Sequence, residues 1–416
     1  MQSKTYTLIA LASLVATGHA VAGPLSPPAG PIGSSGPTLL QVADLDPLAD
    51  LVDDIDQQAD ELTALETRID VLSLPGDASN THIITQPGSY YLSDDIIVTA
   101  ADTNGIQIDA DNVTLDLSGR QIIGANLNDA SRGITGSTTL TRLNVVVRNG
   151  TIRDFQHPVF ARLRLSRLES LTMIRSVVSG SNVVVLGDSD SNMVIGCQIQ
   201  AAGTAGQALV LSNTYAHVIA ETHCRVVPIG PNLGRGSAVR DCTVTTTTLG
   251  NGLRGDAGSV FRRCSVRDIA GQGFTGLSAG GGNIFVECNA QDCGTDGFDL
   301  VLSMAFNCLA QSCGANGFEL GLRNYLYECT AIDSDDHGFL IETQGSRVEA
   351  CHAETISGVP ANYGFLALQQ ADSCLVIKNT AVNAFTRFND ISINFSSFAP
   401  EWFDVTLAGP WDNLSQ

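Results

Sequence analysis

The stretch CNAQDCGTDGFDL at residues 288–300 is followed by a second copy, CLAQSCGANGFEL, at residues 308–320. Cysteines recur on both sides of these copies at Cys242, Cys264, Cys288, Cys308, Cys329 and Cys351, with spacings of 22, 24, 20, 21 and 22 residues. A Gly-Phe pair follows four of them at a constant distance, and its phenylalanines are Phe274, Phe298, Phe318 and Phe339. Self-similarity at this period is typical of a solenoid in which each repeat forms one coil.

The positions around each cysteine separate into inward and outward sets. Two residues after the cysteine every copy carries valine or alanine, and the residue directly before the cysteine is polar in all copies but one. Alternating apolar positions predict a β-strand, and the polar residue predicts a bend. A coil of 20 to 24 residues with two or three short strands is a parallel β-helix. No Leu-x-x-Leu-x-Leu pattern recurs, which excludes a leucine-rich repeat.

Stacking of the coils places equivalent residues about 4.8 Å apart. We therefore expect one column of cysteines and a second column of phenylalanines. Inward repeat positions favour buried free thiols for the 11 cysteines, with a disulfide such as Cys288–Cys308 or Cys293–Cys313 as the alternative. From Thr81 to Pro400 there is room for roughly 14 coils of this period.

Two earlier stretches carry a resemblance. Leu74-Pro75-Gly76-Asp77-Ala78, Ile83 to Leu92 and Gly105 to Gly119 resemble the leading segment of secreted bacterial right-handed parallel β-helix repeat proteins, which belong to the pectate-lyase-like superfamily. The resemblance covers roughly residues 72–400 and implies a right-handed parallel β-helix. That superfamily includes polysaccharide lyases, glycoside hydrolases, epimerases and surface proteins without assigned chemistry. The resemblance therefore implies an extracellular polysaccharide as partner but no single reaction.

The N-terminal 22 residues predict a signal peptide. Lys4 supplies the positive charge, Leu8 to Ala16 the apolar stretch, and Ala20-Val21-Ala22 the small-residue cleavage site. No later stretch of about 20 apolar residues predicts a membrane span. We expect a secreted bacterial protein, extracellular or periplasmic.

Three further segments flank the predicted β-helix at 73–400. Residues 23–37 are rich in proline and glycine and predict a linker. Residues 38–72 predict an acidic amphipathic helix, because apolar residues recur every seven positions at Leu48, Ile55, Leu62 and Ile69. This helix either caps the first coil or forms a short coiled coil that makes a homo-oligomer. Residues 401–416 predict a C-terminal cap.

The formal net charge of −21 repels nucleic acid and anionic membranes. These partners are therefore excluded. The charge disfavours a polyanionic substrate less strongly, because a calcium ion or a local arginine cluster can bridge it.

The candidate catalytic residues follow the Gly-Phe column. If Phe298 and Phe318 face inward, Asp299 and Glu319 face outward in adjacent coils, with carboxylates roughly 5 Å apart, as for the two carboxylates of a glycoside hydrolase. Asp336 and His337 lie in a nearby turn. Together with their neighbours they resemble the Asp-Asp and His-Gly elements of polygalacturonase-like hydrolases, which lie there on separate coils.

Two other chemistries remain open at this point. A lyase needs an arginine or lysine base, and Arg240 and Arg262 are expected to stack on neighbouring coils. Asp188, Asp190 and Asn192 form a turn whose oxygens suit a calcium ion. No cysteine or histidine spacing indicates zinc.

Three functions are compatible with these features. The short turns of the regular half favour a secreted or cell-surface protein with a structural or glycan-binding role. The alternative is a polysaccharide-active enzyme, either a hydrolase or a lyase. The third is an extracellular protein that assembles end to end into filaments.

Overall fold

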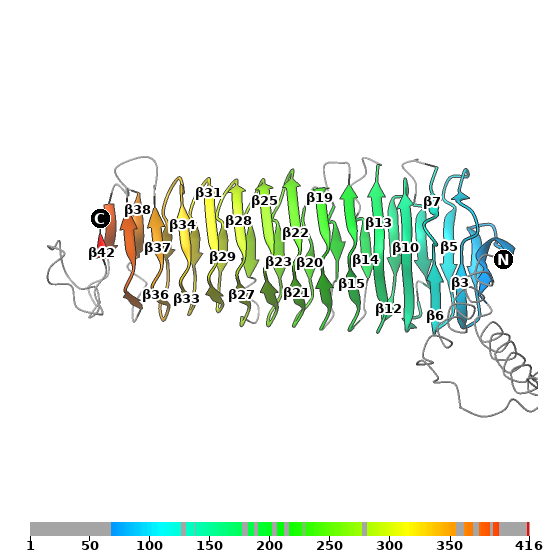
Figure 1. The fold of residues 1–416 in the computed structure, drawn as a ribbon, viewed down its shortest axis with the longest axis horizontal. Helices are drawn as coiled ribbons and strands as arrows, with labels where there is room; N and C mark the ends of the chain where they lie inside the picture. Colours follow the sequence, from blue (N-terminus) through cyan, green and yellow to red (C-terminus); the bar gives the residue numbers. More distant parts are fainter. Residues whose placement is uncertain are drawn as a thin grey trace, which may run out of the picture. The chain divides into compact units, whose positions relative to one another are not determined.

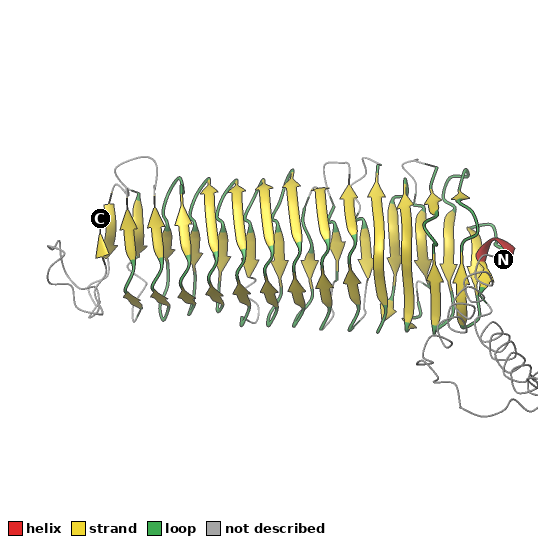
Figure 2. Cartoon of the chain, in the orientation of Figure 1, coloured by secondary structure: helices red, strands yellow, loops and turns green. Residues whose placement is uncertain are grey.

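The computed structural model describes residues 68–390, without 126–129, 138, 177–181, 187–189, 202–205, 212–215, 228, 277–280, 355–361, 369–373 and 383–385, and residues 414–415. The chain divides into two compact units, 1–66 and 67–416. The described residues belong to the second unit. Figures 1 and 2 show strands throughout this unit, with one short helical turn next to the first strands.

The second unit is an all-β parallel solenoid, as predicted. One sheet has 14 strands and takes one strand from each coil. Its strands are β2 (Asn80–Ile84), β5 (Asn104–Ile108), β8 (Arg132–Gly136), β11 (His157–Ala161), β14 (Val184–Leu186), β17 (Leu209–Val210), β20 (Asn232–Leu233), β23 (Leu253–Gly255), β26 (Phe274–Gly276), β29 (Phe298–Leu300), β32 (Phe318–Leu320), β35 (Phe339–Ile341), β38 (Tyr363–Ala367) and β41 (Thr386–Asp390). We call it the 14-stranded sheet.

The remaining strands form a 26-stranded sheet and a two-stranded pair, β9 (Arg142–Leu143) with β12 (Leu163–Arg164). The 26-stranded sheet contains β1 (Ile69–Asp70), β3 (Gly88–Tyr91), β4 (Ile96–Ile97), β6 (Val113–Asp116), β7 (Gln121–Ile123), β10 (Val145–Arg153), β13 (Arg167–Arg175), β15 (Met193–Ile195), β16 (Gln198–Ala201), β18 (Val218–Ala220), β19 (His223–Val227), β21 (Ala238–Arg240), β22 (Thr243–Thr247), β24 (Val260–Arg262), β25 (Ser265–Ile269), β27 (Ile284–Val286), β28 (Asn289–Cys293), β30 (Met304–Phe306), β31 (Leu309–Cys313), β33 (Tyr325–Tyr327), β34 (Thr330–Ile332), β36 (Arg347–Glu349), β37 (His352–Glu354), β39 (Leu375–Ile377), β40 (Thr380–Val382) and β42 (Leu414–Ser415). In the regular half each coil contributes two of these strands, such as β27 and β28.

The phenylalanine column forms as predicted. The fully buried rings of Phe298 and Phe318 stack with centroids 4.7 Å apart and planes 5° from parallel. Phe318 and Phe339 stack at 4.9 Å, and Phe365 continues the column at 4.7 Å from Phe339. This stacking fixes the register between coils, because a one-residue slip would turn each ring to the outside.

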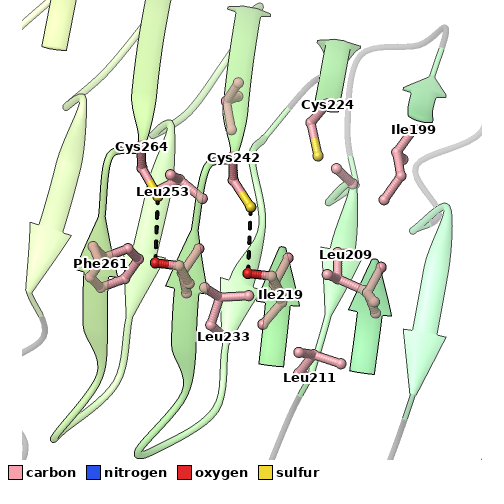
Figure 3. Packing of buried hydrophobic residues seen from close by; sticks show 14 of the residues in the cluster. Ile199, Leu209, Leu211, Ile219, Cys224, Leu233, Cys242, Leu253, Phe261 and Cys264 are labelled. Atoms are coloured by element: carbon pink, nitrogen blue, oxygen red, sulfur yellow. Dashed lines mark hydrogen bonds between the residues drawn. The ribbon is translucent and has the colours of Figure 1, made fainter. Parts of the chain in front are cut away.

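The cysteines are buried free thiols, and none of the 11 forms a disulfide. In the column each thiol donates to the carbonyl of the residue two positions earlier, as from Cys308 Sγ to Phe306 O at 3.4 Å. Figure 3 shows Cys242 and Cys264 among apolar neighbours, with the thiol of Cys242 directed to the carbonyl of Ile219 in the previous coil. The thiols therefore act as small apolar core residues.

The residue before each column cysteine forms the bend between the two strands of the 26-stranded sheet. Its φ angle is positive in every regular coil, for example 54° at Asp241, 55° at Glu287 and 52° at Asn307. A single left-handed residue turns the chain sharply, and aspartate and asparagine tolerate this conformation better than most residues. The predicted outward bend is confirmed.

A second corner carries buried serine and asparagine side chains. Asn324 Oδ1 accepts from Ser303 N at 2.9 Å, and Asn324 N donates to Ser346 Oγ at 3.1 Å. These bonds satisfy backbone donors that the bend removes from the strand ladder. This row of stacked serine and asparagine side chains was not predicted from the sequence.

The end of the predicted N-terminal helix requires a correction. Residues 69–70 form β1, which pairs with β3, and residues 71–73 form a single 3-10 turn. Val71 is buried in the first coil, and the carboxylate of Asp70 accepts from Leu72 N at 3.1 Å. Pairing with β3 therefore replaces the helical pattern here. The signal peptide, the linker and the remainder of the helix lie outside the described residues.

At the C-terminal end, β42 pairs with β40 and adds a strand to the last coils. The other residues of the predicted cap at 401–416 lie outside the part that the structure describes. Within the described part, no helix has the length and apolar character needed to cross a membrane.

Candidate functional site

Asp299 and Glu319 are neighbours on the outer face of the 14-stranded sheet. In β29, Phe298 and Leu300 are buried and Asp299 between them is half-buried; β32 repeats this with Phe318, Glu319 and Leu320. The two strands pair in register, so Asp299 lies directly opposite Glu319. The predicted orientation of both side chains is thus observed.

Asp296 adds a third carboxylate from the corner that precedes β29. Its side chain is 5% exposed, and Oδ1 accepts from Asn316 N at 3.0 Å and from Asn316 Nδ2 at 2.9 Å. The negative charge of Asp296 acts on the Glu319 carboxyl of the next coil.

Glu342 supplies a fourth carboxylate from the coil after Glu319. It follows β35, and its backbone nitrogen donates to Leu320 O at 2.9 Å. We call Asp296, Asp299, Glu319 and Glu342 the carboxyl cluster.

Burial and neighbouring negative charge set the protonation of the cluster. Burial, followed by the charge of Asp296, raises the pKa of Glu319 to about 8. Burial also raises the pKa of Asp299, but a hydrogen bond from Gln272 opposes this rise. At neutral pH Glu319 therefore carries a proton. The ionised form of Asp299 is instead stabilised by the hydrogen bond that Gln272 donates.

Gln272 is held in one orientation. Its Oε1 accepts from Asn251 Nδ2 at 3.0 Å and from Thr275 Oγ1 at 3.1 Å. Its Nε2 then donates to Asp299 Oδ2 at 2.8 Å. Since both donors occupy the oxygen, the amide cannot flip without losing them, and the donor stays aimed at Asp299.

His337 lies in the same corner column as Asp296 and Asn316. Gly317 N donates to His337 O at 2.9 Å, and His337 Nδ1 accepts from Tyr363 N at 3.2 Å. The neutral ring therefore carries its proton on Nε2, and burial lowers the pKa of His337. Asp336 is exposed, and its backbone nitrogen donates to Ala315 O at 3.0 Å. Of the two residues, His337 is the one aligned with the cluster.

Two of the expected calcium residues, Asp190 and Asn192, lie between β14 and β15, several coils before the carboxyl cluster. Asn192 is 1% exposed and belongs to the serine-asparagine corner: its Oδ1 accepts from Ser166 N at 3.0 Å, and its Nδ2 donates to Leu163 O at 2.6 Å. Asp190 is half-buried, and Asp188 lies outside the described residues. The calcium site stays a prediction. Among the residues that the structure describes, no group of three His, Cys, Asp or Glu side chains could hold a metal.

The arginines considered for a lyase are in register, as expected. Arg240 pairs with Arg262 on the outer face of the 26-stranded sheet. They thus lie on a different sheet from the carboxyl cluster.

Sequence reasoning identified the pair but missed two of its partners. Glu342 comes three residues after Phe339, and Gln272 comes two residues before Phe274. Alternation from Phe339 would have placed Glu342 on the outer face, whereas Gln272 occupies the corner column of Asp296, Asn316 and His337, two residues before each phenylalanine. Their reach into neighbouring coils depends on side-chain conformation, which the repeat does not encode.

Comparisons with known proteins support the fold. No family model and no curated protein matches this chain. A double mutant of the tailspike protein of E. coli bacteriophage HK620, in complex with a pentasaccharide, superimposes with a TM-score of 0.51 at 10% identity, over 85% of this chain and 79% of the tailspike. The A-module of the Azotobacter vinelandii mannuronan C-5 epimerase AlgE4 gives 0.35 at 11% identity, over 79% and 87%. The likeness to the tailspike supports the parallel β-helix fold of this chain.

Proposed function

We propose that the protein is an exported glycan-binding β-helix that hydrolyses glycosidic bonds at the carboxyl cluster. The observation that carries this proposal is the in-register pair of Glu319 and Asp299, in which one carboxyl holds a proton at neutral pH and the other has a fixed hydrogen-bond donor. Two carboxyls with different protonation are what glycoside hydrolysis requires.

In this proposal Glu319 acts as the general acid. Its proton passes to the glycosidic oxygen, and the bond between that oxygen and the anomeric carbon breaks. The negative charge of Asp296 and Glu342 keeps the proton on Glu319 until the substrate oxygen accepts it. The leaving sugar departs as an alcohol, so charge and protons balance in this step.

Asp299 acts as the nucleophile. Neighbouring coils lie about 4.8 Å apart, close to the roughly 5 to 5.5 Å that separates the carboxyls of retaining enzymes. The Asp299 carboxylate bonds to the anomeric carbon, and a water deprotonated by Glu319 then displaces it. The expected product keeps the configuration of the substrate, and no cofactor takes part.

The fold supports a glycan as the ligand, since the superimposed tailspike was solved with a pentasaccharide. The predicted signal peptide supports an extracellular or periplasmic location, where such polymers are found. We assign His337, which lies in the corner column of Asp296, and the exposed Asp336 beside it to substrate contacts rather than to proton transfer.

A panel of bacterial and plant polysaccharides tests the proposal, with new reducing ends as the readout. The wild type should release them from at least one polymer. Asp299→Asn and Glu319→Gln should each lower the rate by 100-fold or more, because each removes one chemical role. Glu354→Gln, on the outer face of the 26-stranded sheet, is the matched control and should leave the rate unchanged.

Three outcomes would change the assignment. Retarded migration of the protein in polysaccharide-containing gels without new reducing ends would favour the binding role without catalysis. Unsaturated products that absorb near 235 nm would indicate a lyase and would contradict hydrolysis. Retained hydrolysis in both amide variants would remove the cluster from consideration.

A further inference from the structure

Arg132, His157 and Phe160 come together on the outer face of the 14-stranded sheet, in the irregular half of the solenoid. Arg132 begins β8 and His157 begins β11, and the two residues pair in register. Phe160 pairs with Thr135 in the same two strands. We call Arg132, His157 and Phe160 the arginine-aromatic site.

Among the described residues, the Arg132 side chain has an aromatic partner and no acidic partner. Its guanidinium carbon lies 4.0 Å from the centre of the Phe160 ring, and Nη1 donates to Thr135 Oγ1 at 3.4 Å. Nε is buried without a hydrogen-bond partner among the described residues. Among the residues that the structure describes, no carboxylate forms an ion pair with Arg132. Its positive charge has no counterion there.

Nearby arginines behave differently. Arg142 pairs with Asp109, Arg148 with Asp116, and Arg153 with Asp154. A half-buried cation is costly to leave uncompensated, and a guanidinium stacked on a ring keeps its edge available for a planar anion. In a chain with a net charge of −21, an arginine that lacks this pairing indicates a position for an external anion.

His157 supplies an acceptor beside this cation. Its Nδ1 donates to Asn182 O at 2.6 Å, so the neutral ring presents Nε2 as an acceptor. The ring lies 5.2 Å from the Phe160 ring. Burial and the charges of Arg132 and Arg175 lower the pKa of His157, which keeps the ring neutral at pH 7.

We propose that the arginine-aromatic site binds an organic carboxylate that carries a neighbouring hydroxyl group. The carboxylate takes the free edge of the Arg132 guanidinium, and the hydroxyl donates to Nε2 of His157. An acidic sugar unit and a small hydroxy acid share this chemistry. Inorganic phosphate is the competing anion, because it also carries a hydroxyl group at pH 7 but lacks the C–H groups with which an organic acid can contact the Phe160 ring.

This site is separate from the carboxyl cluster. β8 is the third strand and β29 the tenth in the order of the 14-stranded sheet, so seven strand spacings lie between them. At about 4.8 Å per spacing this is roughly 34 Å. Binding here does not depend on the proposed hydrolysis.

Titration calorimetry of the full chain tests the proposal with D-glucuronate, glycolate, acetate, D-glucose and inorganic phosphate. We expect glucuronate or glycolate to bind at least tenfold more tightly than acetate, glucose and phosphate. Tighter binding of glucuronate assigns the site to an acidic sugar, and tighter binding of glycolate assigns it to a free hydroxy acid. Either order supports the shared chemistry.

Variants locate the binding. Arg132→Gln should weaken the preferred ligand at least tenfold, and Phe160→Leu should weaken it while leaving the charge in place. Arg267→Gln removes an exposed arginine of the 26-stranded sheet that pairs with Asp292, and it should bind like the wild type. Unchanged affinity in Arg132→Gln, no binding of either hydroxy carboxylate, or phosphate binding as tight as theirs would overturn the proposal.

Discussion

Glu319 lies directly opposite Asp299 in the neighbouring coil, on the outer face of the 14-stranded sheet. The two residues occupy equivalent positions of the repeat, yet their surroundings differ. The charges of Asp296 and Glu342 raise the pKa of both carboxyls, but only the pKa of Asp299 is lowered again by a hydrogen bond from Gln272. The stacking of coils therefore turns two equivalent positions into two carboxyls with different proton affinities.

The first prediction concerns stability and pH. Folding raises the pKa of Glu319 from 4.5 to about 8, so between these values the folded chain binds a proton that the unfolded chain releases. The free energy of unfolding should therefore fall as the pH rises from 4.5 to 8. Glu319→Gln should remove this slope and should be more stable than the wild type at pH 8.5 by roughly 1 to 2 kcal/mol, allowing for solvent screening.

Urea unfolding monitored by circular dichroism measures this effect. At pH 4 the two proteins should have equal midpoints, because the carboxyl is protonated in both states. Glu354→Gln serves as the control on the other sheet. Parallel pH profiles for the wild type and Glu319→Gln would show that Glu319 titrates normally.

The second prediction concerns Gln272. Replacing it with leucine removes the donor to Asp299 Oδ2, while Asn251 and Thr275 remain. Without this hydrogen bond, the effect of burial is unopposed, and the pKa of Asp299 should rise further. Carbon-13 NMR of labelled aspartate side chains measures the change. Gln291→Leu, on β28 of the 26-stranded sheet, should leave that resonance unchanged, and an equal effect of both substitutions would refute the role of Gln272.

The third prediction tests the core. Ala310 is fully buried, and a methyl group built on Gly297 would lie 2.6 Å from its Cβ, so no space remains around this position. Ala310→Phe should destabilise the protein by about 3 kcal/mol or more. Leu309→Phe, at the adjacent half-buried position, is the control with a small expected effect. Equal denaturation midpoints for Ala310→Phe and the wild type would mean that the assigned register is wrong.

Particular residues show which features a sequence of this kind encodes. The columns of Phe298 and Cys308 were predictable, because stacked coils bring identical repeat positions together. The pair of Asp299 and Glu319 was predictable from strand alternation. Each of these inferences needed only the repeat period and the position of the inward side chains.

Other features depend on information that the repeat does not contain. The effect of the Glu342 charge on Glu319 and the contact of Arg132 with Phe160 depend on side-chain conformation, and Arg132 lies in the half where the period is irregular. The end of the expected helix at residues 69–72 was wrong, because the pairing of Ile69 and Asp70 with β3 overrides the local helical pattern. Such pairing between distant segments cannot be deduced from the spacing of apolar residues alone.

The fourth prediction concerns the thiols. Burial raises the pKa of Cys224 and Cys308, and each side chain is 2% exposed. A thiol reagent such as dithionitrobenzoate should therefore react very slowly with the native protein at pH 8. After unfolding in guanidinium without reductant, all 11 cysteines should react. Fewer reactive thiols in the unfolded chain would reveal disulfides, and fast reaction of the native chain would contradict their burial.

The measurement that tests the account most directly is the titration of the Glu319 carboxyl itself. Carbon-13 NMR of protein labelled at glutamate side chains gives one resonance for each carboxyl, and Glu319→Gln identifies the resonance of interest. The account predicts a midpoint near pH 8 for this resonance. A midpoint near 4.5 would mean that Glu319 is ionised at neutral pH, and it would contradict its assignment as the proton donor.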